Sequence, residues 1–287
     1  MPCTPPYTQC ARHVASIALE TAVEKLIQAK ELARRRPAYV RSLRRYLRQF
    51  SCGRETQPLS EISHDVIESW FLDRREAPSA QRSNLGRLGS LFSYAIRRGW
   101  IRDNPILRVE KPTIDHAPPK ILTARQCSAL MNHVASEDPE ALAWFSICLF
   151  AGVRPSEADR MTWASIGRDT LVIDAAASKV RRRRVVTLMP SAAEWVQRSR
   201  DARARMPIPF STRRRMIRRA RECLGLPAWP QDVLRHTCAS YWVAHVEDVG
   251  RVAMQLGNSP DILLQHYREL VTREEAQAFW AIRPDPR

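Results

Sequence analysis

Apolar residues recur at helical spacing through most of the first hundred positions. Residues 12–51 fit two helices with a break between them, and a third helix is expected to begin after Ser63, which suits the N-cap. A fourth helix follows Pro78 and ends near Gly99, where glycine and the preceding arginines favour helix termination. The pattern therefore predicts a compact all-helical module over residues 1–110.

The periodicity breaks over residues 111–119, where prolines cluster and predict a linker. A new helix should start at Thr123, because Thr123 and Gln126 have the spacing of a capping box. Residues 140–160 contain a strongly apolar helix, and three short β-like runs then precede further helical spacing: Met161–Ala164, Leu171–Ile173 and Val185–Leu188. We expect a second domain over residues 120–287, mainly α-helical with a small antiparallel β-sheet.

The net charge of the chain indicates what kind of partner it binds. The chain has 46 Lys+Arg against 30 Asp+Glu, a formal net charge of +16, and such a surplus repels itself unless a polyanion neutralises it. Nucleic acid is the leading partner and an anionic membrane surface the alternative. No apolar run approaches the roughly 18 residues of a membrane span, and the N-terminus lacks a signal-peptide pattern, which favours nucleic acid.

The surplus is concentrated between Lys179 and Arg221, where 15 basic residues face two acidic ones. This run is either a solvated arginine-rich face or a DNA-binding surface. Lys179 is the only lysine beyond position 120. The seven cysteines show no CxxC pair and no zinc-ligand spacing, so we expect reduced core thiols in a cytoplasmic protein.

Cleaving a phosphodiester without a metal requires fixed cations on the phosphate, a nucleophile and an acid for the leaving oxygen. Arginine suits the first role because its planar fork meets two oxygens and stays charged. A lysine among arginines suits the last role, because neighbouring cations lower its pKa. Lys179 has that setting.

Four ordered motifs resemble the tyrosine recombinase (phage integrase) family. They are Gly152-Val153-Arg154-Pro155-Ser156-Glu157, the lysine turn Ala177-Ser178-Lys179, Asp232-Val233-Leu234-Arg235-His236-Thr237 and Leu256-Gly257-Asn258-Ser259-Pro260. Tyr267 follows nine residues after Asn258, at the family's spacing for its nucleophile. The resemblance covers nearly the whole chain and implies a helical core-binding domain followed by a tyrosine-recombinase catalytic domain.

The resemblance also implies roles. Arg154 and Arg235 match the arginines that hold the scissile phosphate, Lys179 matches the general acid, and Tyr267 matches the nucleophile of a 3′-phosphotyrosyl link. Glu157 and His236 are expected to position the catalytic residues without contacting the phosphate themselves. No metal or other cofactor is implied. Double-stranded DNA is the expected partner, contacted by several arginines: Arg181, Arg182, Arg183, Arg184, Arg213 and Arg214.

Two positions depart from the family pattern. Asp232 and Asn258 stand where histidine is usual. Asn258 can still donate a hydrogen bond to a phosphate oxygen, whereas an ionised Asp232 would repel one. Asp232 could instead pair with Arg235, act as a base towards the tyrosine, or simply cap the helix that follows it. We include both residues among the catalytic candidates.

The resemblance predicts site-specific recombination, with integration or excision of a mobile element as the leading role. Xer-like resolution of replicon dimers, topoisomerase-like relaxation and a catalytically weakened DNA-binding protein are the alternatives. A homo-tetramer on DNA at the nucleoid is expected. A capping box at Thr272 and Glu275 predicts a terminal helix, which packs on its own domain or, as we hypothesise, on a neighbouring copy.

Overall fold

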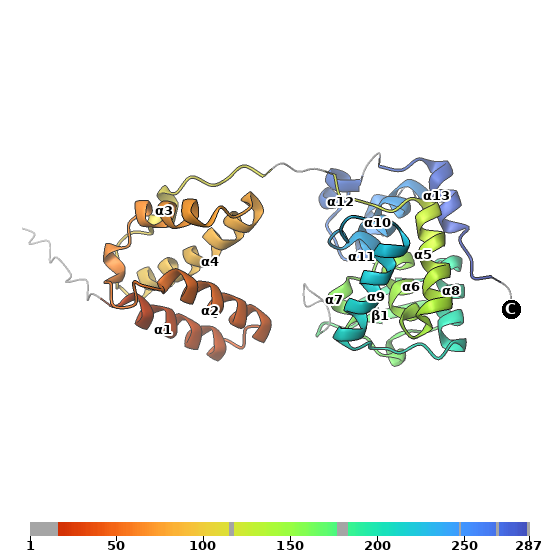
Figure 1. The fold of residues 1–287 in the computed structure, drawn as a ribbon, viewed down its shortest axis with the longest axis horizontal. Helices are drawn as coiled ribbons and strands as arrows, with labels where there is room; N and C mark the ends of the chain where they lie inside the picture. The colour runs from red at the N-terminus through yellow and green to blue at the C-terminus, as the bar shows by residue number, and fades with distance from the viewer. Residues whose placement is uncertain (1–16, 115–117, 177–182, 247, 268–269, 286–287) are drawn as a thin grey trace, which may run out of the picture. The chain divides into compact units, whose positions relative to one another are not determined.

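The computed structural model describes residues 17–114, 118–176, 183–246, 248–267 and 270–285, and the chain divides into two compact units, Met1–His116 and Ala117–Arg287 (Figure 1). Over its described residues the first unit is mainly helical, with loops between the helices. It contains α1 (Leu19–Leu32), α2 (Pro37–Ser51), α3 (His64–Arg74) and α4 (Pro78–Arg97), with 3-10 turns at Leu59–Glu61 and Pro105–Arg108.

These helices form where the sequence predicts them. Ser63 caps α3, its hydroxyl accepting a hydrogen bond from the backbone N–H of Val66 at 3.4 Å. The apolar faces of the helices meet in one core, in which the Trp70 ring makes edge contacts with its neighbours Tyr46, Phe50 and Phe71. The first unit therefore has its own hydrophobic core.

The second unit is also mainly helical. Its elements in chain order are α5 (Ala124–Glu137), α6 (Leu142–Phe150), α7 (Pro155–Ala158), β1 (Thr170–Ile173), β2 (Arg184–Thr187), α8 (Pro190–Asp201), α9 (Phe210–Cys223), α10 (Val233–His245), α11 (Val249–Leu256), α12 (Pro260–Tyr267) and α13 (Arg273–Trp280), with 3-10 turns at Pro139–Ala141 and Trp163–Ser165. Every residue of α6 is buried, and α5, α8 and α10 pack around it. A helix that is apolar on all sides lies at the centre of a fold, as α6 does here.

The sheet is smaller than predicted. Strands β1 and β2 pair antiparallel, with Leu171 opposite Val186, which confirms the small antiparallel sheet. The predicted strand at Met161–Ala164 is wrong, because this segment runs into a 3-10 turn. The Trp163 indole donates a hydrogen bond to the carbonyl of Ala204 at 2.9 Å, and this contact holds the turn. The apolar residues of the segment therefore support a turn and not a strand.

The terminal helix α13 packs on its own unit. The Phe279 ring stacks on Tyr241 of α10 with centroids 4.3 Å apart, and the Trp280 indole donates to the Tyr241 carbonyl at 3.3 Å. Thr272 and Glu275 form the predicted capping box. Within the single chain α13 thus packs on its own unit, and docking on a neighbouring copy stays a hypothesis.

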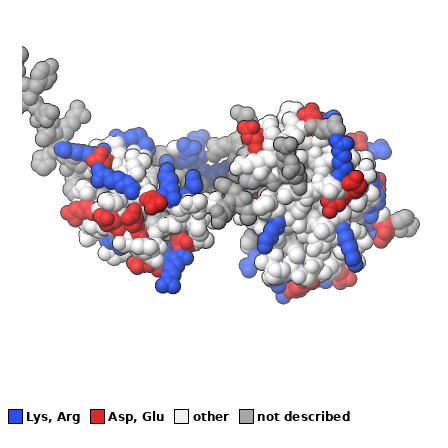
Figure 2. Space-filling model, turned by 90° about the horizontal axis from the view of Figure 1, so that it is seen from above, with Lys and Arg blue, Asp and Glu red and all other residues white. Residues whose placement is uncertain are grey.

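The surface mixes charges of both signs. On the face shown in Figure 2, basic and acidic side chains are interspersed over both units. Among the described cysteines, Cys127, Cys148 and Cys238 are buried as predicted, but Cys52 and Cys223 are exposed. None of the described helices is both long enough and apolar enough to span a bilayer.

Candidate active site

A glycine turn at the end of α6 places Arg154. Gly152 has a φ of +60°, and a Cβ there would lie 2.3 Å from Leu256 Cδ2 and 3.3 Å from Cys238 Sγ. Only glycine combines that backbone conformation with so close an approach. The turn thus lets the chain pass against Cys238 of α10 and Leu256 of α11, and it is followed by Arg154, the partly buried N-cap residue of α7.

Glu157 holds two arginines in place. Its carboxylate is fully buried and accepts two hydrogen bonds from Arg184 of β2, at 3.1 and 2.6 Å, and two from Arg154, from its backbone N–H and its guanidinium, both at 3.2 Å. Burial by itself would raise the pKa of Glu157, but the hydrogen bonds and charge of Arg184, with the charge of Arg154, lower it to about 2. The carboxylate is therefore ionised at neutral pH and fixes both guanidiniums.

Arg235 of α10 approaches from the other side and is only 4% exposed. Its guanidinium donates to the carbonyl of Gly152 and, at 2.7 Å, to the carbonyl of Leu256. Burial, followed by the charges of Arg154 and Arg184, lowers the pKa of Arg235 to about 10. It nevertheless remains protonated at neutral pH, as guanidiniums do.

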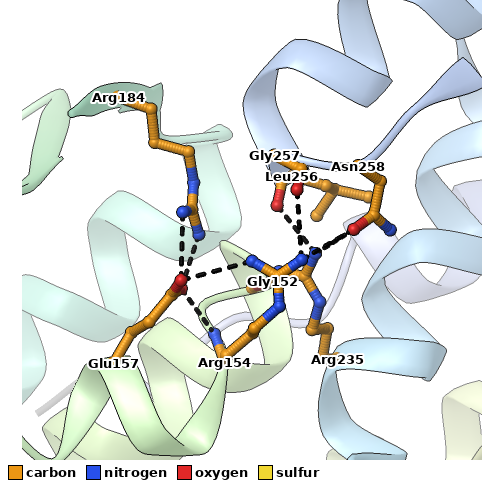
Figure 3. A network of polar contacts seen from close by, with 8 residues as sticks. All are labelled: Gly152, Arg154, Glu157, Arg184, Arg235, Leu256, Gly257 and Asn258. Atoms are coloured by element: carbon orange, nitrogen blue, oxygen red, sulfur yellow. Dashed lines mark hydrogen bonds and ion pairs between the residues drawn. The ribbon is translucent and has the colours of Figure 1, made fainter. Parts of the chain in front are cut away.

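The turn after α11 joins the two arginines (Figure 3). Asn258 Oδ1 accepts hydrogen bonds from Arg154 at 2.8 Å and from Arg235 at 3.0 Å. Arg154 also donates to the carbonyl of Gly257 at 3.1 Å. An amide oxygen held by two guanidiniums occupies the kind of position that suits an oxygen of a phosphate.

Tyr267 ends α12 beside these cations. Its side chain is 4% exposed, and its hydroxyl lies 2.7 Å from Nδ1 of His236 on α10. Burial raises the pKa of Tyr267, as do the charges of Asp232 and Cys238, while Arg235 and Arg154 act in the opposite sense. The hydroxyl is thus protonated at neutral pH and hydrogen-bonded to a potential base.

Asp232 occupies the N-cap position of α10, but its side chain makes no capping hydrogen bond and its φ is +51°. Within the part of the chain that the structure describes, no hydrogen bond or ion pair engages its carboxylate. It does not pair with Arg235, which is one of the alternatives that the sequence left open. Its electrostatic influence reaches Tyr267.

The candidate DNA-binding arginines differ in their surroundings. Arg183 and Arg214 are exposed, whereas Arg184 is bound to Glu157 and Arg213 pairs with Asp159 and lies over the Phe210 ring. Lys179, Arg181 and Arg182 lie outside the described residues. Sequence reasoning missed the contact of Arg184 with Glu157 and the carbonyls of Gly152, Leu256 and Gly257, since backbone acceptors leave no mark on residue type.

Comparison with known proteins identifies the family to which the chain is similar. Residues 120–274, more than half of the chain, match the model of the phage integrase family. The tyrosine recombinase XerC of Roseiflexus sp. (strain RS-1) is 26% identical over 266 residues, which cover 83% of this chain and 83% of that protein.

Solved structures show the same fold. A dimer of a lambda integrase fragment bound to a COC′ core site superposes with a TM-score of 0.72 at 16% identity, covering 89% of this chain and 98% of that one. A lambda integrase tetramer bound to a Holliday junction gives a TM-score of 0.69 at 18% identity, covering 87% and 78% of the two chains.

Proposed function

We propose that this chain, which belongs to the phage integrase family, is a site-specific recombinase that cleaves and rejoins double-stranded DNA through a 3′-phosphotyrosyl intermediate. The observation that carries the proposal is the convergence of Arg154, Arg235 and Asn258 next to Tyr267. These residues come from three separate segments of the second unit, so their meeting depends on the fold.

The proposed chemistry needs no metal. Arg154 and Arg235 bind the non-bridging oxygens of the scissile phosphate, whose charge grows in the transition state. Phosphate takes the place of the Asn258 oxygen between the two guanidiniums. Tyr267 attacks the phosphorus as the bond to the 5′ oxygen breaks, and Lys179, assigned from the family resemblance, donates a proton to that oxygen.

Glu157 and Arg184 support this site. Arg184 is predicted from sequence to contact DNA, but its bidentate contact with the buried Glu157 favours a positioning role. Glu157 fixes Arg154 through the same carboxylate. Arg183 and Arg214, both exposed, are the described candidates for contacts with the DNA backbone, together with Arg181 and Arg182 from sequence.

We assign the biological role to the integration or excision of a mobile element, in keeping with the family. The similarity to a XerC recombinase along most of the chain favours resolution of replicon dimers as the second candidate. Assembly as a homo-tetramer on DNA is proposed by analogy with the lambda integrase tetramer bound to a Holliday junction, and a DNA partner would place it at the nucleoid. Flanking repeats and phage genes around the coding sequence would distinguish the two roles.

A duplex with a nick close to the cleavage site tests the reaction. Cleavage releases a short fragment that carries the free 5′ hydroxyl, and its loss prevents religation and traps the covalent protein–DNA adduct. The wild type should form a denaturant-resistant adduct, and Tyr267→Phe should form none while still binding DNA. Tyr241→Phe, which alters a buried tyrosine of α10, is the matched control and should still form the adduct. A wild type that binds its site but forms no adduct would favour a DNA-binding protein without catalytic activity.

A further inference from the structure

We propose that His236 is the base that removes the proton from Tyr267 during attack, and that Asp232 supports His236 electrostatically. The inference rests on the proposed function. It identifies what activates the nucleophile in a chain where the usual histidine of the second arginine motif is replaced by Asp232.

Tyr267 needs a proton acceptor. Its burial raises its pKa, and the opposing charges of Arg235 and Arg154 do not reverse that direction. The hydroxyl therefore keeps its proton at neutral pH and must release it as the bond to phosphorus forms. Proton transfer requires an acceptor within hydrogen-bonding distance of the hydroxyl.

His236 meets that requirement. Its Nδ1 lies 2.7 Å from the Tyr267 hydroxyl, and the two rings are 5.7 Å apart between centroids. In the neutral imidazole that carries its hydrogen on Nε2, Nδ1 is the acceptor of the hydrogen bond with the Tyr267 hydroxyl and can take its proton. His236 directly follows Arg235 on α10, so one helix holds both a proposed phosphate-binding cation and the base.

Charged groups near Tyr267 and His236 affect the stability of the imidazolium that forms when His236 takes the proton. From α10, Asp232, Arg235 and Cys238 act on Tyr267, and Arg154 acts from the turn before α7. Nearby cations disfavour an imidazolium, whereas a nearby carboxylate stabilises one. Asp232 is the N-cap residue of α10, and its carbonyl accepts a hydrogen bond from the backbone N–H of His236 at 2.9 Å, so its carboxylate is attached one helical turn before the imidazole.

The proposed step balances. The bond between the Tyr267 oxygen and phosphorus forms as the bond from phosphorus to the 5′ oxygen breaks. The phenolic proton moves to Nδ1 of His236, and the 5′ oxygen takes a proton from the acid assigned to Lys179. In religation the imidazolium returns its proton to the tyrosine as that residue leaves.

Single-turnover adduct formation on the nicked duplex between pH 5 and 9 tests the assignment. The wild-type rate should rise with pH as the imidazole loses its proton, and then level. His236→Asn can keep a hydrogen bond at the Nδ1 position but cannot take a proton. It should be slower by roughly 100-fold, a general-base effect, and should lose the rise with pH.

Several measurements keep the outcome unambiguous. His245→Asn, at the exposed far end of the same helix, is the matched control and should keep the wild-type rate and profile. Binding of the intact duplex and the thermal midpoint show that each variant is folded, and His236→Gln serves as the second variant if His236→Asn is not.

A His236 variant with the wild-type rate and pH profile would overturn the inference alone. A rise with pH that survives in His236→Asn but disappears in Asp232→Asn would also overturn it, because the base would then be Asp232. If the wild type forms no adduct at any pH, both the proposed function and the role of His236 are wrong.

Discussion

The second unit holds one set of arginines at the candidate active site and another along α9. At the active site, the buried Arg235 and the partly buried Arg154 and Arg184 gather around Glu157 and the turn after α11. Along α9, three arginines pair with carboxylates of other segments: Arg213 with Asp159, Arg215 with Glu140, and Arg219 with Glu137 and Asp138.

The difference lies in how the charge is compensated. At the active site, the guanidiniums of Arg154 and Arg184 contact the Glu157 carboxylate, whereas that of Arg235 donates to neutral carbonyl and amide oxygens among the described residues. Positive charge therefore remains in excess there, in a buried setting where electrostatic interactions are strong. The α9 pairs are more exposed, and such pairs contribute little. Basic composition alone does not distinguish a phosphate site from a salt-bridged surface.

Removal of the central carboxylate should have the largest effect. Glu157→Gln leaves Arg184 and Arg154 without their counter-ion, and breaking a buried pair costs about 3–5 kcal/mol. The free energy of unfolding, measured by urea denaturation, should fall by this order and adduct formation should be lost. Glu140→Gln, which removes the partly exposed partner of Arg215, is the matched control and should cost about 0–1 kcal/mol.

The same pair gives a pH dependence. The Glu157 pKa is about 2 in the fold against 4.5 as the ordinary value, which corresponds to about 3 kcal/mol of stability. Because the folded pKa is depressed, this stability is present above pH 4.5 and is lost as the pH falls towards 2. Glu157→Gln should lack this contribution, and equal acid sensitivity of wild type and variant would contradict the account.

Adding a charge at the turn should have the next largest effect. Asn258→Asp places a carboxylate between Arg154 and Arg235, where it neutralises charge and competes with phosphate. Adduct formation should fall by roughly 100-fold, as when a preorganised contact to the developing anion is lost, while the thermal midpoint holds or rises. Asn258→His removes the acceptor without adding negative charge and should lose less. Equal rates for both variants would contradict a phosphate site here.

The smallest effects should come from neighbouring arginines on α9. Arg214 is exposed, and Arg214→Ala should reduce the slope of log affinity against log salt by about 0.9 if it contacts one phosphate. Arg213→Ala should leave that slope unchanged and lower stability by about 1 kcal/mol, because its guanidinium pairs with Asp159. DNA titrations at several salt concentrations, with melting curves, check both. A reduced salt slope for Arg213→Ala and an unchanged one for Arg214→Ala would contradict the proposal that Arg214 contacts DNA and Arg213 does not.

Much of the fold could be predicted from the sequence, because helix periodicity and capping are local. The break between α1 and α2, the Ser63 cap and both capping boxes follow from neighbouring residues. The strand predicted at Met161–Ala164 failed because a short apolar run fits a turn anchored by Trp163 equally well.

At the site, motif spacing selected Arg154, Arg235, Asn258 and Tyr267, which the structure brings together from distant segments. The contact of Arg184 with Glu157 and that of His236 with Tyr267 could not be inferred. Both depend on how β2, α10 and α12 pack, and the sequence offers many other arginines and histidines of the same chemistry.

The most direct test of the account is to identify the amino acid that is bonded to DNA in the trapped adduct. Nuclease and protease digestion followed by mass spectrometry should yield a nucleotide attached through a 3′ phosphate to the peptide that contains Tyr267. Attachment at any other residue would contradict the assignment of the nucleophile. A wild type that binds its site and yields no modified peptide would contradict recombination by a phosphotyrosyl intermediate.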